Sequence, residues 1–134
     1  MPTLHCKIVP TTNQGINKLT LSNNIRSQKL TLQSAIITID GTGFNHNAIY
    51  VRLPFLSSNQ FHSTDQLGYL AFPVLKNTKQ LQTFNFGGGL SMPCDHIPEV
   101  FEAQIFDEDL AGLTSSTHFT SIDLYFSYES AGLF

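Results

Sequence analysis

The stretch SIDLYFSYE, residues 121–129, decides the fold class of this chain. Every second residue is apolar, which places four side chains on one face of an extended segment: Ile122, Leu124, Phe126 and Tyr128. A period of two is typical of a half-buried β-strand. The stretch AIYVRLPF, residues 48–55, has the same period. Pro54 has no backbone donor, so that strand is expected to end there or to lie at a sheet edge.

Strand patterns recur along the chain, and no stretch shows a sustained helical period. The further candidates are HCKIV, NKLTLS, KLTLQSAIITID, LGYLAFPV, QTFNF and EVFEAQIF, at residues 5–9, 17–22, 29–40, 67–74, 82–86 and 99–106. The segments KLTLS and KLTLQS resemble the two arms of a hairpin. In the longest candidate, Leu30 and Leu32 share a face with Ile36, whereas Ile37 and Ile39 lie on the opposite one. Either a bulge or two partly buried faces explains this change of parity.

About eight strands separated by polar loops predict a β-sandwich or a barrel. Several of the loops are long, which fits crossings between two sheets better than the short turns of a meander. We therefore expect an all-β chain that forms a single eight-stranded antiparallel jelly-roll sandwich. An immunoglobulin-like sandwich is the second choice, because the chain lacks a candidate for the buried Trp and for the paired cysteines of antibody domains.

The length of 134 residues favours one domain. Residues 1–15 are expected to be an N-terminal arm or the first strand, residues 16–130 the jelly-roll domain, and residues 131–134 a short apolar C-terminal tail. The inward faces of the best strands predict the core, which consists of Ile37, Ile39, Ile49, Val51, Leu53, Phe84, Phe86, Val100, Ile105, Ile122, Leu124 and Phe126.

The composition argues against several classes of function. Only 13% of the residues are charged, about half the usual share, so the surface must be rich in uncharged polar groups. A net charge of −3 with seven scattered Lys and Arg residues argues against a nucleic-acid partner. No apolar run is long enough for a membrane span, and the first residues lack the features of a signal peptide. Cys6 and Cys94 are expected to be reduced thiols.

The segment FGGGLSMPCDHIPEVF, residues 86–101, combines three glycines with Cys94, Asp95 and His96. Neither a Lys-Ser/Thr pair nor a helix follows the glycines, so we expect a flexible turn after the strand that carries Phe84 and Phe86, and not a phosphate cradle. Cys94 and His96 are not expected to form a catalytic dyad, because side chains two residues apart diverge from a shared proton path. The two prolines that bracket this segment predict a stiff connector.

Metal-ligating residues are present but scattered. Beyond Cys94 and His96, the candidates are His5, Cys6, His46, His62 and His118, and no predicted strand carries two histidines as a cupin strand does. The acidic run at residues 107–109 lacks the spacing of an EF-hand, so we expect a solvated loop there, with room for one helical turn in residues 107–113. No metal or other cofactor is expected.

Carboxylates and aromatic side chains leave two possibilities open. The sequence cannot pair the remaining acids into a hydrolase site, although Asp40, Glu99, Glu102, Asp123 and Glu129 are available. Four aromatic residues either form a second buried face or meet a sugar or a protein partner, namely Phe44, Phe61, Tyr69 and Tyr125. The chain is expected not to be an enzyme.

The closing stretch IPEVFEAQIFDEDLAG, followed by a polar loop and FTSIDLYFSYE, resembles the last strand pair of small viral jelly-roll proteins. RLPFL followed by LGYLAFPV adds to this likeness. Residues 16–130 are similar in size and pattern to the single jelly-roll vertex (penton) or minor capsid proteins of icosahedral double-stranded DNA viruses, such as virophages, polinton-like viruses and larger relatives.

That resemblance implies a structural protein of the virion, assembled in the host cell, of which five copies close the vertex. The implied partners are further copies of the chain, the major capsid protein and other minor capsid proteins. Two other readings remain. A carbohydrate-binding, lectin-like sandwich would need aromatic residues on a concave face and often a calcium site, and a small cupin-like or hydrolase-like enzyme is the third.

Both ends of the chain carry apolar residues, which is unusual for termini that nothing holds in place. They are Leu4, Ile8, Val9, Leu133 and Phe134. We expect at least one end to contact an adjacent subunit, for example by adding a strand to the edge of a neighbour's sheet. In the alternative, residues 5–9 are simply the first strand of their own sheet.

Overall fold

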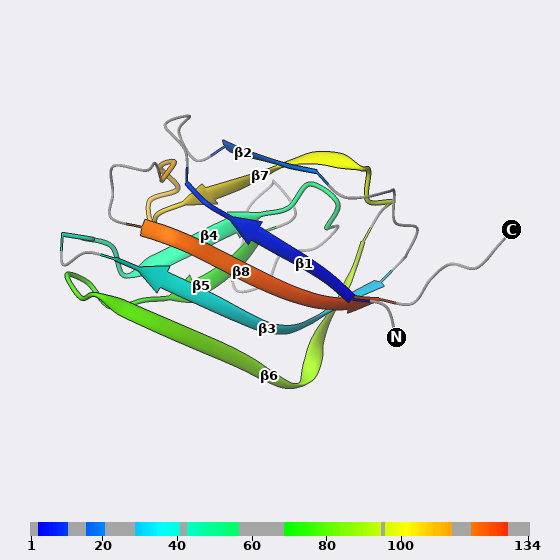
Figure 1. The fold of residues 1–134 in the computed structure, drawn as a ribbon, viewed down its shortest axis with the longest axis horizontal. Helices are drawn as coiled ribbons and strands as arrows, with labels where there is room; N and C mark the ends of the chain where they lie inside the picture. Colours follow the sequence, from blue (N-terminus) through cyan, green and yellow to red (C-terminus); the bar gives the residue numbers. More distant parts are fainter. Residues whose placement is uncertain are drawn as a thin grey trace, which may run out of the picture.

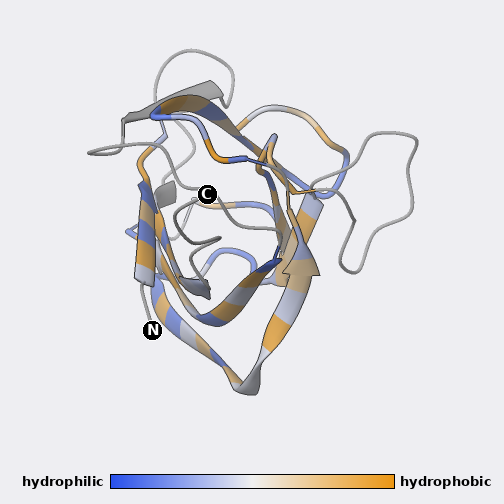
Figure 2. Ribbon diagram, turned by 90° about the vertical axis from the view of Figure 1, so that its right-hand side faces the viewer, coloured by the Kyte–Doolittle hydropathy of each residue, from blue (hydrophilic) through white to orange (hydrophobic). Residues whose placement is uncertain are grey.

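The structure is a computed structural model that describes residues 3–10, 16–20, 29–40, 43–56, 69–94, 96–113 and 119–128, with the backbone alone for residues 16–20 and 119–120. Within these residues there are eight β-strands and no helix. The strands are β1 (Thr3–Ile8), β2 (Ile16–Thr20), β3 (Lys29–Ile39), β4 (Ala48–Arg52), β5 (Tyr69–Pro73), β6 (Gln80–Pro93), β7 (Val100–Phe106) and β8 (Phe119–Tyr128). Hydrophobic and hydrophilic residues alternate along them (Figure 2). The prediction of an all-β chain is confirmed.

The strands form two antiparallel sheets that face each other (Figure 1). Sheet A has the order β1-β8-β3-β6 and sheet B the order β2-β7-β4-β5. The pairing is nested, because β1 pairs with β8, β2 with β7, β3 with β6 and β4 with β5. Among the described strands, only β4 and β5 are consecutive within one sheet, so the predicted crossings between sheets are confirmed. The predicted hairpin of KLTLS and KLTLQS is wrong, since β2 and β3 belong to different sheets.

One cluster of buried side chains from both sheets fills the space between them. Most of the predicted core residues belong to it, namely Ile37, Ile39, Ile49, Val51, Leu53, Ile105, Ile122, Leu124 and Phe126. Val100 was predicted wrongly and is 44% exposed. It precedes Ile105 by five positions, so the two side chains point to opposite faces of β7. Phe84 and Phe86 are only half-buried, and they pack against the edge of this core.

A bulge accounts for the change of parity in β3. The register against both β6 and β8 shifts between Leu32 and Ser34. Against β8, whose residues Tyr125 and Phe126 are adjacent, Gln33 is the extra residue of the bulge. The shift brings the buried side chains of both halves of the strand onto one face, namely Leu30, Leu32, Ala35, Ile37 and Ile39. Of the two explanations that the sequence allowed, the bulge is the one found.

The glycine run lies inside β6 and not in a turn after a strand, so that prediction is wrong. Asn85 pairs with Ser34 and Leu90 with Leu32, so four residues of β6 stand opposite the single residue Gln33. At Gly89 the backbone has a φ of 89°, and an added Cβ would collide with Cγ2 of Thr31. Glycine at position 89 is therefore what allows β6 to pass this irregularity and pair with β3 again.

Candidate interaction surface

An apolar groove opens between β5 and β6. These two strands end their sheets on the same side of the domain (Figure 1). Its volume is about 500 Å³. The lining side chains come from β4, β5 and β6, and they are Ala48, Ala71, Phe72, Pro73, Phe84 and Phe86. The rings of Phe72 and Phe84 contact each other in the lining, with centroids 5.5 Å apart and planes tilted by 55°.

The two edge strands beside the groove differ in length. β6 has 14 residues and β5 has five, so β5 cannot cover the whole inner face of β6. Gln80, Gln82, Phe84 and Phe86 alternate along that face, and all four are half-buried. The apolar pattern thus predicted the correct face of the strand. Their burial depends on how far the opposite sheet extends.

The described segments that carry β5 and β6 have almost no charge. Residues 69–75 and 80–94 contain no Asp, Glu, Lys or Arg, and the turn between them supplies only Lys76 and Lys79. Leu75 and Leu81 are large apolar side chains on this side, and Leu81 is 68% exposed. Edge strands of monomeric proteins are usually protected by charges, prolines or a short length. A long, uncharged edge beside an apolar groove is typical of a surface that a protein partner covers.

The chemistry of the groove favours a polypeptide over a sugar. Ala, Pro and Phe side chains line it, and they offer no hydrogen-bonding group. A sugar site needs polar groups for the hydroxyls beside its aromatic rings, whereas an apolar protein segment needs only complementary surface.

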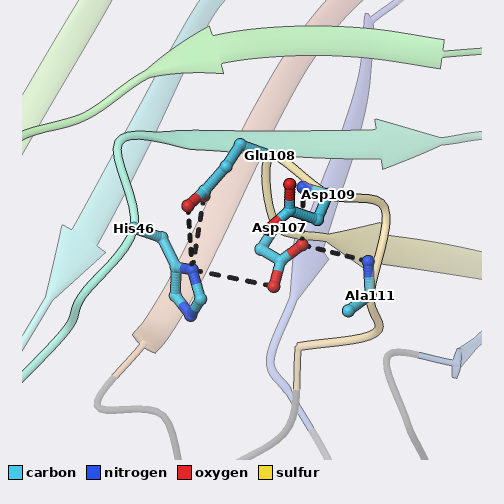
Figure 3. A network of polar contacts seen from close by, with 5 residues as sticks. All are labelled: His46, Asp107, Glu108, Asp109 and Ala111. Carbon is cyan, nitrogen blue, oxygen red and sulfur yellow. Dashed lines mark hydrogen bonds and ion pairs between the residues drawn. The ribbon is translucent and has the colours of Figure 1, made fainter.

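The principal polar cluster among the described residues joins the connection between β3 and β4 to the turn after β7 (Figure 3). His46 Nδ1 lies 3.3 Å from Glu108 Oε2 and 3.6 Å from Asp107 Oδ2. Asp107 is buried, and its Oδ1 accepts hydrogen bonds from the backbone N–H groups of Asp109, at 2.8 Å, and of Ala111, at 3.0 Å. The predicted helical turn is absent here, because the Leu110 N–H closes a β-turn on the Asp107 carbonyl at 3.0 Å.

This cluster is structural in its geometry. The Asp107 carboxylate serves as an acceptor for its own turn and faces His46 as well. Glu108 also faces His46, which it approaches with both carboxylate oxygens. Within the residues that the structure describes, no three His, Cys, Asp or Glu side chains are arranged to hold a metal ion.

A second polar contact lies on sheet A, between β1 and β8. His5 Nε2 is 2.8 Å from Asp123 Oδ1. The imidazole also stacks on the ring of Tyr125, with centroids 4.4 Å apart and planes 6° apart. One face of Tyr125 is therefore occupied by His5. Of the other aromatic candidates, Phe44 and Tyr69 are buried, which agrees with the prediction that such residues form a second buried face. Phe61 lies outside the described residues.

Neither Cys6 nor Cys94 forms a disulfide in this structure, and both are buried. Burial raises the pKa of the Cys6 thiol to about 12, because the thiolate would lose its hydration. Cys94 forms a single β-bridge with Leu56, while His96 is exposed and Asp95 lies outside the described part of the chain. The thiol and the imidazole thus occupy different environments.

Three of the remaining sequence candidates lie on the surface of the described part of the domain. Asp40, Glu99 and Glu102 are exposed. Three further candidates, His62, His118 and Glu129, lie outside the described residues, as do Leu133 and Phe134.

The predicted interface residues of the N-terminal segment fall into two groups. Leu4 and Ile8 are buried in the core of their own domain, since β1 is the edge strand of sheet A and pairs with β8. Their side chains are therefore part of the fold, as expected if this segment is the first strand of its own sheet, and an interface role for them stays a prediction. Val9 follows β1 and is 51% exposed, so it is the one N-terminal candidate that the structure leaves accessible.

Comparison with known proteins adds no relative: no family model matches the chain, and no curated protein matches it. Among the described residues there is also no helix long and apolar enough to cross a membrane.

Proposed function

We propose that this chain is a structural protein of an icosahedral viral capsid, where it closes the vertex as a homopentamer in contact with the major capsid protein. The observation that carries the proposal is the nested pairing of the strands, from β1 with β8 to β4 with β5. We infer from this nesting that the chain is a jelly roll, an architecture used by capsid proteins, lectins and cupins. An immunoglobulin-like order would instead place the first two strands side by side.

The surface supports a capsid role over the other two uses of this architecture. The apolar groove and the uncharged β6 edge beside it fit a protein neighbour, and they offer little to a glycan. The polar clusters around His46 and His5 are engaged in contacts between segments of the fold. The proposal places the protein in the virion, after assembly in the host cell.

Native mass spectrometry of the purified protein over a range of concentrations tests the proposal. A chain of 14.9 kDa should give an assembly of five copies, about 75 kDa. A protein that stays monomeric at every concentration, and that binds a defined sugar on a glycan array, would instead be the lectin-like module.

A further inference from the structure

The domain has two opposite sides at which both sheets end. On one side lie β1 of sheet A and β2 of sheet B, which contact each other. On the other side lie β6 and β5, which flank the apolar groove. Among the described strands, none pairs with the outer edge of any of these four.

The directions of the strands make these two sides complementary. Each sheet has four strands, and every neighbouring pair is antiparallel. The two edge strands of one sheet therefore run in opposite directions. A second copy placed beside the first in the same orientation would continue the antiparallel alternation in both sheets, with β1 beside β6 and β2 beside β5.

We propose that copies of this chain associate head to tail, so that β1 of one copy pairs with the first half of β6 of the next and covers the groove. The inference rests on the proposed homopentamer and names the surface through which it forms. A head-to-tail contact joins two different patches and generates a ring when the rotation closes. It covers both open sides of every copy, whereas a two-fold contact between β6 strands would leave β1 and Val9 uncovered.

The register we propose matches the inward and outward faces of both strands. It places the exposed Val9 of one copy opposite the exposed Leu81 of the next. Since the strands are antiparallel, it also places three inward positions of β1 beside three inward positions of β6, pairing Ile8 with Gln82, Cys6 with Phe84 and Leu4 with Phe86. The half-buried rings of Phe84 and Phe86 are then covered further by β1 of the next copy.

The charges are compatible with this register. Lys7 and His5, on the outer face of β1, would lie opposite Thr83 and Asn85 of the uncharged β6 edge. Both partners are polar and neutral, so no like charges meet. A contact between two β1 edges would instead bring the lysines and histidines of two copies together.

Disulfide cross-linking between two variants tests the inference. Residues opposite each other in an antiparallel pair have Cα atoms about 4.5–5.5 Å apart, within the range of a disulfide. We expect Val9→Cys and Leu81→Cys proteins to form a cross-linked dimer when they are mixed under mild oxidation, and the double variant to form a ladder that ends at five copies. Each single variant alone should stay uncross-linked, because the native cysteines are buried.

The controls separate this inference from the proposed function. Val100→Cys, at an exposed apolar site on the inner strand β7, should not cross-link with Leu81→Cys. Cross-linking of Leu81→Cys with itself would overturn the inference in favour of a two-fold contact. A five-copy mass without any Val9–Leu81 cross-link would overturn the inference and leave the proposed function standing, and a monomer at every concentration would overturn both. Thermal unfolding of each variant, expected unchanged at these exposed sites, checks the fold.

Discussion

Truncation of two phenylalanines on the inner face of sheet A tests whether the groove is open. Phe126 lies on β8, which pairs on both sides, and its ring is 1% exposed. Phe84 lies on the edge strand β6 and is half-buried beside the groove. Phe126→Ala removes a ring from a closed core and leaves a cavity, so it should lower the free energy of unfolding by about 3–5 kcal/mol.

Phe84→Ala should behave differently in the isolated domain. Its ring already borders open space, so its removal creates no closed cavity and only part of the transfer free energy is lost. We expect a loss of about 1 kcal/mol, roughly half the value of a fully buried side chain. Urea unfolding at a concentration where the protein is monomeric measures both variants. Equal losses for the two substitutions would refute the open groove, and a loss near zero for Phe126 would show that the inward face has been assigned backwards.

Three further predictions concern single sites. Asp107→Ala removes the acceptor of two backbone N–H groups and should lower the free energy of unfolding by about 2–4 kcal/mol. Asp107→Asn keeps an acceptor oxygen, so its free energy of unfolding should fall by less. Chemical denaturation compares the two variants. Gly89→Ala should destabilise the fold by more than about 1 kcal/mol, because position 89 has a positive φ and the added Cβ would collide with Thr31 of β3. Gly87→Ala, which has open space around it, should be tolerated. Equal melting temperatures of the two variants would contradict this expectation. Burial raises the pKa of the Cys6 thiol to about 12 in the folded state, so the unfolded chain loses this proton at a lower pH than the folded one. The free energy of unfolding should therefore fall by about 1.4 kcal/mol per pH unit as the pH rises from the ordinary thiol pKa towards the folded-state pKa. Cys6→Ala should flatten this part of a plot of the free energy of unfolding against pH.

The sequence could predict the fold where a strand obeys one simple rule. In β8 the alternation around Phe126 gave the correct inward face. In β3 the alternation predicted both the strand and its irregularity, because a bulge moves the buried positions from even to odd residue numbers along the strand. Val100 was misplaced because it was grouped with Ile105 although the two positions differ in parity.

Other features depend on contacts between distant segments, which periodicity does not encode. Nothing in the pattern of β6 shows that Phe84 remains half-buried beside β5. The glycine run reads locally as a turn, and only the pairing with β3 on both sides of Gln33 makes it part of a strand. His46 and Asp107 meet across the fold from distant positions in the sequence, so the cluster could not be predicted without the topology.

The candidate interaction surface could be anticipated only in part. Val9 was predicted as an interface residue and is accessible, but Leu4 and Ile8 from the same segment are core residues of β1. The absence of charge from residues 80–94 is visible in the sequence. Its meaning depends on the position of β6 at the edge of its sheet.

A cryo-EM reconstruction of the purified, assembled protein tests the central claim most directly. The account predicts a closed ring of five copies in which β6 of each copy lies beside β1 of the next and the groove between β5 and β6 is filled. A ring with the groove facing solvent, a two-fold particle joined through β6, or particles of single domains only would contradict it.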